Sequence, residues 1–333
     1  MNNREYALPS DKKRKRLIRI HAKTSPYYGK PPEDRSIREL LANGMINLDK
    51  PQGPTSHQVV AWLKNILEIE RAGHGGTLDP NATGVLPVAL GSATRAIKVL
   101  LSAGKEYIGI MRLHKKRKKQ EIIRACSCFV GDIYQLPPVR SAVKRVRRKR
   151  HVYYFDILQI KDTEVLFRVG CEAGTYIRTL CVDIGRKLGC GAHLSGLRRT
   201  RVGGLKEENA VVLQDLKDAY IFWKEEGDEE DLRRMVLPME RLLDHLPKIV
   251  VRDSAVDAIC HGANLAIPGV VELDTDIKKN DLIAILTLKG EGVALANAAM
   301  TTDEILQKDN GICATIDRVL MNRGTYPSIW KKP

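Results

Sequence analysis

The sequence predicts an α+β fold with two domains, in which a small β-barrel follows a larger domain of strands and helices. The chain has 333 residues, 43% of them hydrophobic and 29% charged, which is sufficient for two buried cores. From about Met45 to Arg201, segments whose apolar residues alternate as in a strand are interspersed with segments whose apolar residues have helical spacing. From Ile249 onward, short strands follow one another with turns between them, a pattern typical of a barrel.

The charge balance indicates an acidic partner. There are 55 Lys and Arg against 40 Asp and Glu, a formal net charge of +15. Such a balance favours nucleic acid first and a membrane surface second. The membrane alternative has little support, because the chain has no run of about 18 apolar residues and no apolar segment behind its N-terminal charges.

The cysteines predict no metal site. None of the seven forms a CxxC pair, and an odd number without regular spacing is typical of reduced intracellular thiols. They are Cys126, Cys128, Cys171, Cys181, Cys190, Cys260 and Cys313.

Residues 1–36 predict an extended arm rather than a folded unit. They are polar, contain the basic run Lys12–Arg16 and have prolines at positions 26, 31 and 32. A disordered, solubilising tail is the alternative interpretation.

The segment Leu48–His57 predicts the end of a strand, a turn and the start of a helix. Thr55 or Ser56 can accept hydrogen bonds from the free amides of the first helical turn. The helix that follows is amphipathic, and its apolar face comprises Val59, Val60, Leu63, Ile66 and Leu67.

The loop Gly73–Gly84 has the strongest functional signal. Its four glycines allow sharp turns and close approach to a ligand, and Pro80 restricts the backbone after the single carboxylate of Asp79. The apolar run Val85–Leu90 follows. An aspartate before a proline most often lies in a turn or caps a helix. In so basic a chain, the alternative is carboxylate chemistry on a polyanion.

Residues 112–150 hold most of the positive charge. They contain 14 Lys and Arg against Glu121 and Asp132, a net +12 of the chain's +15. A charge run is usually a solvated face, but this density predicts binding to phosphates. Binding to nucleic acid should therefore weaken steeply with salt, since counterions are released from the phosphates.

Two strands and a helix complete this domain. Gly104–Ile110 and Val165–Gly170 alternate as strands, and a tyrosine such as Tyr107 on a strand is more often a core residue than a catalytic one. Thr175 predicts the N-cap of a helix that ends at Gly189.

Arg178 falls in the first turn of that helix, where the helix dipole disfavours a cation. We expect a compensating anion, and the family resemblance described below implies that it is Asp79, within about 6 Å. A solvent-exposed arginine is the alternative.

Several of these motifs together resemble the TruB family of RNA pseudouridine synthases. The loop Gly73–Gly84 contains that family's Gly-Gly-Thr-Leu-Asp-Pro sequence, and Tyr176–Arg178 matches its Tyr-Ile-Arg motif. Leu197–Arg201 resembles its last core signature, and Gln135–Lys144 resembles the thumb loop that clamps substrate RNA.

The resemblance extends over positions 45–330 and indicates the archaeal, dyskerin-type branch, because His261–Gly269 and the strands after it look like a PUA domain. It implies a catalytic domain built on a mixed, mostly antiparallel β-sheet flanked by helices, plus a small β-barrel PUA domain. The implied boundaries are 1–36 for the arm, which would pack on the C-terminal domain, 37–247 for the catalytic domain and 248–325 for the PUA domain. Lys115–Lys119 departs from the family pattern, which has a more acidic turn there.

The resemblance also implies residue roles. Asp79 is the catalytic carboxylate, Tyr107 stacks on the target base, and the arginines of Leu197–Arg201 face RNA or the sheet edge. Substrate contacts or support of the loop are implied for Lys50, His74, Tyr176, Arg178 and Leu197. RNA contacts are implied for Arg140, Lys144, Arg145, Arg147 and Arg148.

The implied function is isomerisation of uridine to pseudouridine in rRNA or tRNA, guided by an H/ACA RNA and without metal or redox cofactor. The implied protein partners are Nop10, Gar1 and L7Ae, and the implied location is the cytoplasm of an archaeon, or the nucleolus if the source is eukaryotic. Two alternatives stay open: a stand-alone tRNA pseudouridine synthase and an inactive RNA-binding scaffold. Replacing Asp79 by Asn or Ala is expected to abolish turnover and leave RNA binding nearly intact.

Overall fold

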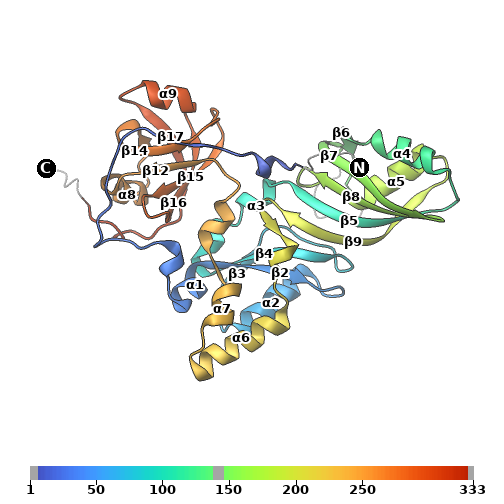
Figure 1. Ribbon diagram of the computed structural model, residues 1–333, viewed down its shortest axis with the longest axis horizontal. Helices are drawn as coiled ribbons and strands as arrows, with labels where there is room; N and C mark the ends of the chain where they lie inside the picture. Colours follow the sequence, from blue (N-terminus) through green and yellow to red (C-terminus); the bar gives the residue numbers. More distant parts are fainter. Residues whose placement is uncertain (1–6, 138–145, 329–333) are drawn as a thin grey trace.

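The computed structural model describes residues 7–137 and 146–328, which form two β-sheets with helices packed on them (Figure 1). The larger sheet has ten strands and the C-terminal sheet has seven. One cluster of buried residues contains side chains from both, such as Met45 and Val85 from the first and Ala284 and Leu295 from the second. The two sheets therefore share part of their core.

The ten-stranded sheet is mixed and mostly antiparallel, as predicted. Among its described strands, every pair of hydrogen-bonded neighbours is antiparallel except β4 with β9. Its path runs β11 (Leu237–Pro238), β2 (Gly44–Lys50), β4 (Thr83–Leu90), β9 (Ala192–Val202), β5 (Lys105–Leu113), β8 (Glu164–Cys171), β7 (Arg148–Lys161) and β6 (Gly131–Gln135), with β3 (Ala72–His74) on β4 and β10 (Leu205–Lys206) on β9.

Helices cover the two halves of this sheet. On the β2 and β4 half, they are α1 (Ile37–Asn43), α2 (Ser56–Ile66), α6 (Leu213–Glu226) and α7 (Glu230–Met235). On the other half, they are α4 (Lys119–Ser127) and α5 (Ile177–Lys187), while the short α3 (Val99–Ser102) leads into β5. The predicted cap of α2 is Thr55, whose hydroxyl accepts a hydrogen bond from the Gln58 amide at 3.2 Å.

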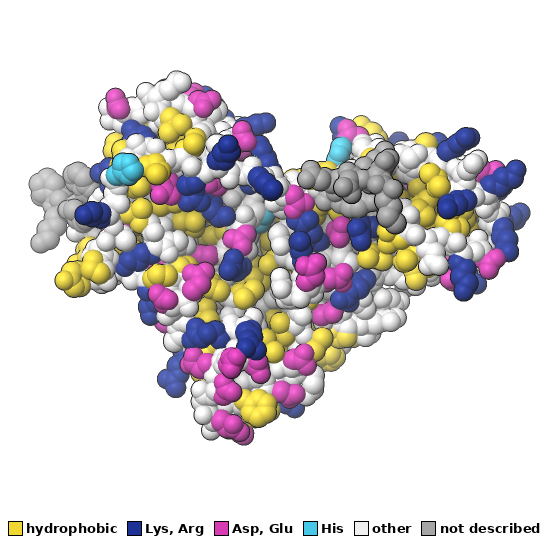
Figure 2. Space-filling model, viewed as in Figure 1, with side chains coloured by type: hydrophobic (Ala, Val, Ile, Leu, Met, Phe, Trp, Pro, Cys, Tyr) yellow, Lys and Arg dark blue, Asp and Glu magenta, His cyan; other side chains and the backbone are white. Residues whose placement is uncertain are grey.

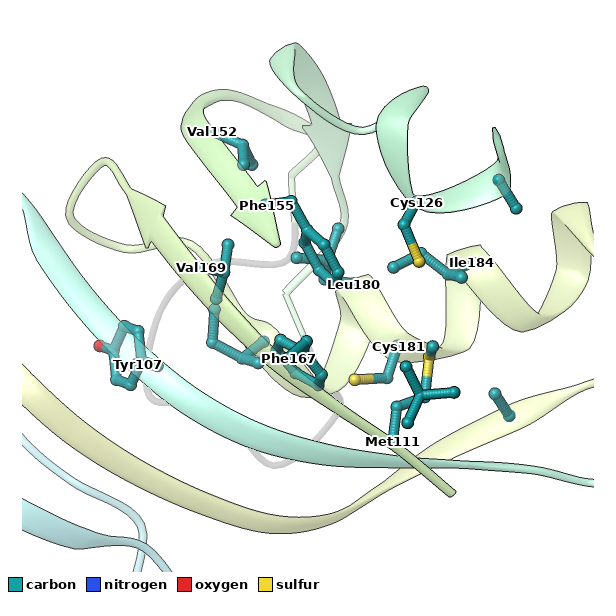
Figure 3. Close-up of a cluster of buried hydrophobic side chains, with 14 of the residues drawn as sticks. Tyr107, Met111, Cys126, Val152, Phe155, Phe167, Val169, Leu180, Cys181 and Ile184 are labelled. Atoms are coloured by element: carbon teal, nitrogen blue, oxygen red, sulfur yellow. The ribbon is translucent and has the colours of Figure 1, made fainter. Parts of the chain in front are cut away.

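Strand β5 shows why the sequence alternates as it does. Lys105, Tyr107, Met111 and Leu113 are buried, while the residues between them are more exposed. The side chains of Tyr107, Met111 and Leu113 join a cluster under α4 and α5, with Tyr107 at its edge (Figure 3). Period-two burial of this kind is what packing one face of a strand requires.

The C-terminal sheet includes a strand from the N-terminal arm. Its path is β1 (Arg16–Ile18), β14 (Val270–Asp274), β12 (Lys248–Val251), β15 (Leu282–Thr287), β16 (Gly292–Ala298), β17 (Ile312–Val319) and β13 (Leu265–Ala266), with α8 (Asp253–Cys260) and α9 (Thr302–Gln307) beside it. Strand β1 pairs with β14, and Arg16 donates to Asp274 at 2.7 Å. The arm thus packs on the C-terminal domain, as the resemblance implied.

The predicted N-cap of α5 is wrong. The helix starts at Ile177 with Tyr176 as the N-cap, and no side chain caps it. The Thr175 hydroxyl donates instead to the Glu172 carbonyl at 2.7 Å. This bond closes the turn that Gly174 makes with a φ of +77°, so the hydroxyl is already used one residue before the helix.

The basic segment 112–150 is not one surface. Lys115–Lys119 follow the C-terminal end of β5, whereas Arg148–Arg150 pair with β6 beside the opposite end of the sheet, since Val152 and Lys105 both lie opposite Cys171. The nine residues of β5 separate the two groups, a length of roughly 27 Å. The single footprint expected from the sequence is therefore two groups.

Candidate active site

The loop that bears Asp79 is closed at its base by two antiparallel strands. His74 of β3 lies opposite Val88 of β4, and the Gly75 amide donates to the Pro87 carbonyl at 2.9 Å. At the tip, the Ala82 amide donates to the Asp79 carbonyl at 3.0 Å, which makes a tight turn. The sequence between β3 and β4 therefore projects Asp79 from a rigid base.

Arg178 contacts Asp79, as predicted. Its Nη2 donates to Asp79 Oδ2 at 2.5 Å. Both side chains are more than half exposed, at 58% and 60%, so water screens the attraction and the pair adds little to stability. The contact instead fixes where the carboxylate oxygens point.

Lys50 supports the loop from below. Its ammonium is buried and donates to the carbonyls of Pro51, Pro80 and Ala82 at 2.8, 3.1 and 2.9 Å. Burial lowers the pKa of Lys50, and the nearby Asp79 charge acts in the opposite direction. Three acceptors match the three donors of an ammonium group, so this buried cation is fully used by the loop backbone.

Ser56 fixes the residue before Asp79. Its hydroxyl donates to the Leu78 carbonyl at 3.1 Å and accepts from the Leu78 amide at 2.9 Å. The side chain is fully buried at the first turn of α2. The start of α2 is thereby tied directly to the loop that carries Asp79.

Arg199 holds both sides of the loop from β9. Its Nη2 donates to the Gly76 carbonyl at 3.0 Å, and its Nε donates to the Val85 carbonyl at 2.8 Å. Burial lowers the pKa of its guanidinium, whereas a hydrogen bond to Tyr107 acts to raise it. Only a glycine fits at position 84, where φ is +101° and a Cβ would lie 2.2 Å from the Arg199 carbonyl oxygen.

The arginines of Leu197–Arg201 have partners within the chain. Arg199 is 1% exposed, because it occupies an inward position of β9. Arg198 pairs with Asp49 at 2.8 Å, and Arg201 pairs with Asp11 of the arm. Arg199 is therefore closed off from solvent, while Arg198 is partly exposed at 37%, and the expectation that these arginines face RNA or the sheet edge stays a prediction.

Tyr107 and His74 lie beside the loop. Tyr107 faces Arg199 in the β5–β9 pairing and is 8% exposed, and burial raises the pKa of its hydroxyl. His74 accepts from the Gly76 amide at 3.4 Å and meets the His57 ring edge-on at 5.0 Å. Burial lowers the pKa of His74, as do His57 and Arg199.

Tyr176 is held at the start of α5 by Gln135. The Gln135 amide group accepts from the Tyr176 N–H at 2.9 Å and donates to its carbonyl at 3.1 Å. Gln135 is buried and ends β6, so the base of the expected thumb loop is joined to the site. Leu197 is half-buried and packs against the cluster under α5.

The expected RNA contacts are only partly described. Arg140, Lys144 and Arg145 lie outside the described residues. Arg147 and Arg148 are exposed, and the Arg147 guanidinium lies 5.2 Å from the centre of the Tyr134 ring.

Three supporting residues were not recognised from the sequence: Ser56 as an anchor of Leu78, Arg199 and Gln135. The period of β9 does not signal Arg199, because a bulge interrupts the alternation between this residue and Val202. Nothing in the sequence pattern signals the Gln135 contact. In the described part of the chain, no group of three or more His, Cys, Asp and Glu side chains could hold a metal ion. No described helix has the length and apolar character needed to cross a membrane.

Known proteins share this arrangement. The chain is 57% identical over 328 residues to the "Probable tRNA pseudouridine synthase B" of Methanopyrus kandleri, covering 98% of this chain and 97% of the relative. It is 54% identical over 325 residues to the protein of the same description from Methanosarcina barkeri, covering 98% and 96%. The chain belongs to the TruB family of pseudouridine synthases. It is thus an RNA isomerase.

Family models match four segments of the chain. Residues 64–177 match the TruB family pseudouridylate synthase N-terminal domain and 178–244 the tRNA pseudouridylate synthase B C-terminal domain. Residues 247–320 match the PUA domain, and 5–60 match the DKCLD (NUC011) domain.

Two solved structures are similar over nearly the whole chain. A chain of a Cbf5-Nop10-Gar1 complex has a TM-score of 0.93 and 54% identity, covering 96% of this chain and 98% of that one. A chain of an H/ACA RNP bound to a substrate RNA containing 2′-deoxyuridine has a TM-score of 0.92 and 52% identity, covering 97% and 100%.

Proposed function

We propose that this pseudouridine synthase uses Asp79 as its catalytic carboxylate and acts on uridines selected by an H/ACA guide RNA. The observation that supports the role of Asp79 is the way its loop is held. Lys50, Ser56 and Arg199 bond to loop backbone on both sides of Asp79, while Arg178 contacts the carboxylate itself.

The reaction needs one carboxylate. Uridine becomes pseudouridine when the N1–C1′ bond breaks, the base turns, and C5 bonds to C1′ as the C5 proton leaves and N1 gains one. Asp79 can assist as a nucleophile towards the nucleoside or as a base towards a sugar proton. Net hydrolysis of a glycosidic bond ordinarily uses two carboxylates, and this loop offers one.

Tyr107 and Leu197 form the proposed pocket for the base. A stacked base cannot reach the loop, so the target uridine must be flipped out at a cost of a few kcal/mol. Stacking on Tyr107 would offset about 1–3 kcal/mol of this. One side of the Tyr107 ring packs against the core, and a hydrogen bond between its hydroxyl and Arg199 fixes the ring. The other side of the ring would then already be in position for the base.

Guidance by H/ACA RNA is supported by the structural neighbours. The two solved chains described above belong to a Cbf5-Nop10-Gar1 complex and to a substrate-bound H/ACA RNP, and each is matched over 96% or more of this chain. We therefore propose a guide RNA, Nop10 and Gar1 as partners, with L7Ae implied by the family. The names of the relatives favour a second candidate, a tRNA substrate modified without a guide.

The deciding experiment measures tritium release from RNA labelled at uridine C5. Wild type, Asp79→Asn and the control Asp309→Asn are compared with and without the guide RNA and partner proteins. The control removes the same charge from an almost fully exposed carboxylate, at 97%.

Release that requires the guide and Asp79, with the control active, is the expected result. Release from tRNA without a guide would support the second candidate. Turnover by Asp79→Asn would refute the catalytic role, whichever RNA is used.

A further inference from the structure

The basic residues at the outer end of the catalytic domain are not used by the site. They lie around the β5–α4 turn and the last turn of α5. Figure 2 shows Lys and Arg side chains gathered at the right-hand end of the molecule, where Figure 1 places α4. We call the following side chains the outer basic patch: Lys115, Lys116, Arg117, Lys118, Lys119, Arg124 and Lys187.

The patch has little internal neutralisation. Lys116 pairs with Asp162 at 2.5 Å, but both are more than 60% exposed. For Lys115, Lys118 and Lys119, no carboxylate among the described residues lies within ion-pair distance. All three are exposed, so their charge is directed at solvent.

A hollow lies within the patch. Its volume is about 400 Å³, and Arg117, Arg124 and Lys187 contribute to its wall with Glu121 as the one acidic residue among those that line it. Liquid water occupies about 30 Å³ per molecule, so a hydrated phosphate fits. Arg117 is held in position by donating to the Gly189 carbonyl at 3.0 Å.

Helix stability does not explain these charges. Lys118 is the N-cap of α4 and Lys119 its first residue, where the dipole disfavours a cation by about 0.3–1 kcal/mol. Glu121 offsets part of this by accepting from the Lys118 amide. Cations placed against a dipole and left unpaired indicate that an external anion completes the site.

Helix α5 connects the patch to the catalytic loop. Arg178 lies in its first turn, and Arg186 lies eight residues on, two i+4 steps along the same exposed ridge. Val182 between them is 39% exposed and Arg186 is 75% exposed. Lys187 ends the helix nine residues after Arg178, about 14 Å along the axis and about half a turn around it, so it lies on the side of α5 that faces the hollow.

We propose that the outer basic patch binds the sugar–phosphate backbone of the RNA helix that extends from the target uridine. An A-form RNA helix rises somewhat less per base pair than the roughly 3.4 Å of B-DNA, so 14 Å corresponds to about four to five base pairs. The inference rests on the proposed function, because that function places the target uridine at Asp79. Arg178 would then contact the RNA near the uridine and the patch would contact it beyond.

The test compares the salt dependence of RNA binding by full-length proteins. The variant combines Lys115→Gln, Lys118→Gln and Lys119→Gln. The control combines Lys64→Gln, Lys217→Gln and Lys224→Gln, which removes the same charge from α2 and α6. Each protein is titrated with a fluorescent guide–substrate RNA whose arm extends about ten base pairs beyond the uridine, or only about two.

On the long arm, the patch variant should show a slope of log K against log salt that is shallower by about 2–3, since each lost phosphate contact removes about 0.7–0.9. On the short arm it should match wild type, and the control should match wild type on both. A patch variant with the wild-type slope on the long arm would overturn the proposal and favour an acidic protein as the occupant. An equal change in the control would also overturn it, because the effect would then reflect net charge.

Tritium release by wild type and Asp79→Asn, measured on the same preparations, keeps the two proposals separate. Activity of Asp79→Asn refutes the proposed role of that carboxylate whatever the slopes are. The slopes alone decide the role of the patch.

Discussion

Replacing Ser56 by Ala tests whether the start of α2 positions the catalytic loop. The substitution removes one hydroxyl that both donates to and accepts from the backbone of Leu78, the residue before Asp79. It leaves no bulky cavity, because only one oxygen is lost. The loop then has one anchor fewer on the N-terminal side of its carboxylate.

The magnitude follows from the two bonds. Ser56 is fully buried, so the Leu78 amide is left without its acceptor, at a cost of about 1–3 kcal/mol. A displacement of about 1 Å at a catalytic group can lower a rate by about 100-fold. We therefore expect a loss of about 2 kcal/mol in unfolding free energy and a fall of at least about tenfold in kcat, with RNA affinity unchanged.

Thr55→Ala is the matched control at the neighbouring position. Thr55 caps α2 by accepting from the Gln58 amide, and no hydrogen bond joins it to the loop among the described contacts. Loss of such a cap costs about 0.5–2 kcal/mol, similar to the expected cost at Ser56. Urea unfolding measures the stability of both variants, and single-turnover tritium release at saturating RNA measures the chemical step.

The two variants should differ in rate while losing similar stability. Full turnover by Ser56→Ala would show that the Leu78 contacts do not position Asp79. An equal fall in rate for Thr55→Ala would show that α2 stability, rather than the Ser56 hydroxyl, limits catalysis. Either result would refute the reasoning.

Two further predictions concern stability. Burial lowers the pKa of His245 to about 4, so the unfolded chain binds this proton more tightly. The stability that the neutral His245 side chain contributes is fully present above about pH 6.5 and is lost as the pH falls through about 4, by up to about 3 kcal/mol. Urea unfolding midpoints measured above and below this pH range should therefore fall less for His245→Gln than for wild type. Gly84→Ala should lower the unfolding free energy by more than about 3 kcal/mol, because its Cβ would meet the Arg199 carbonyl. Position 53 has a φ of +111° but open space around it, so Gly53→Ala should cost only the backbone strain, about 1–3 kcal/mol. Equal losses in thermal unfolding would contradict this account.

The sequence was informative where periodicity reflects burial. β5 and β8 alternate in burial and were predicted as strands, and the apolar stripe of α2 was predicted as a helix. Strand β7 was not predicted, because Arg148–Arg150 begin it and conceal its alternation. Charged residues at the start of a strand indicate that this end is exposed to solvent, but they do not indicate that the backbone is extended.

The site could be predicted where two side chains of opposite charge meet, and less well where a side chain bonds to a main-chain group. The argument from the helix dipole led to Arg178, because a cation against a dipole calls for a specific anion. No comparable rule leads to Ser56 or Gln135, since their partners are main-chain groups of Leu78 and Tyr176 that every sequence possesses. Such contacts become visible only when the chain is folded.

The loop's irregular backbone accounts for the buried cations around it. The carbonyls of Gly76, Pro80, Ala82 and Val85 do not all find partners in a strand or helix, and a buried carbonyl without a donor is costly. An ammonium with three donors and a guanidinium with five can each serve several such acceptors from one side chain. Lys50 and Arg199 do so. Replacing either by a single neutral donor would remove at least one of these hydrogen bonds. The buried positive charges around the loop are therefore explained by carbonyls that require hydrogen-bond donors. Arg178, in contrast, contacts the Asp79 carboxylate itself.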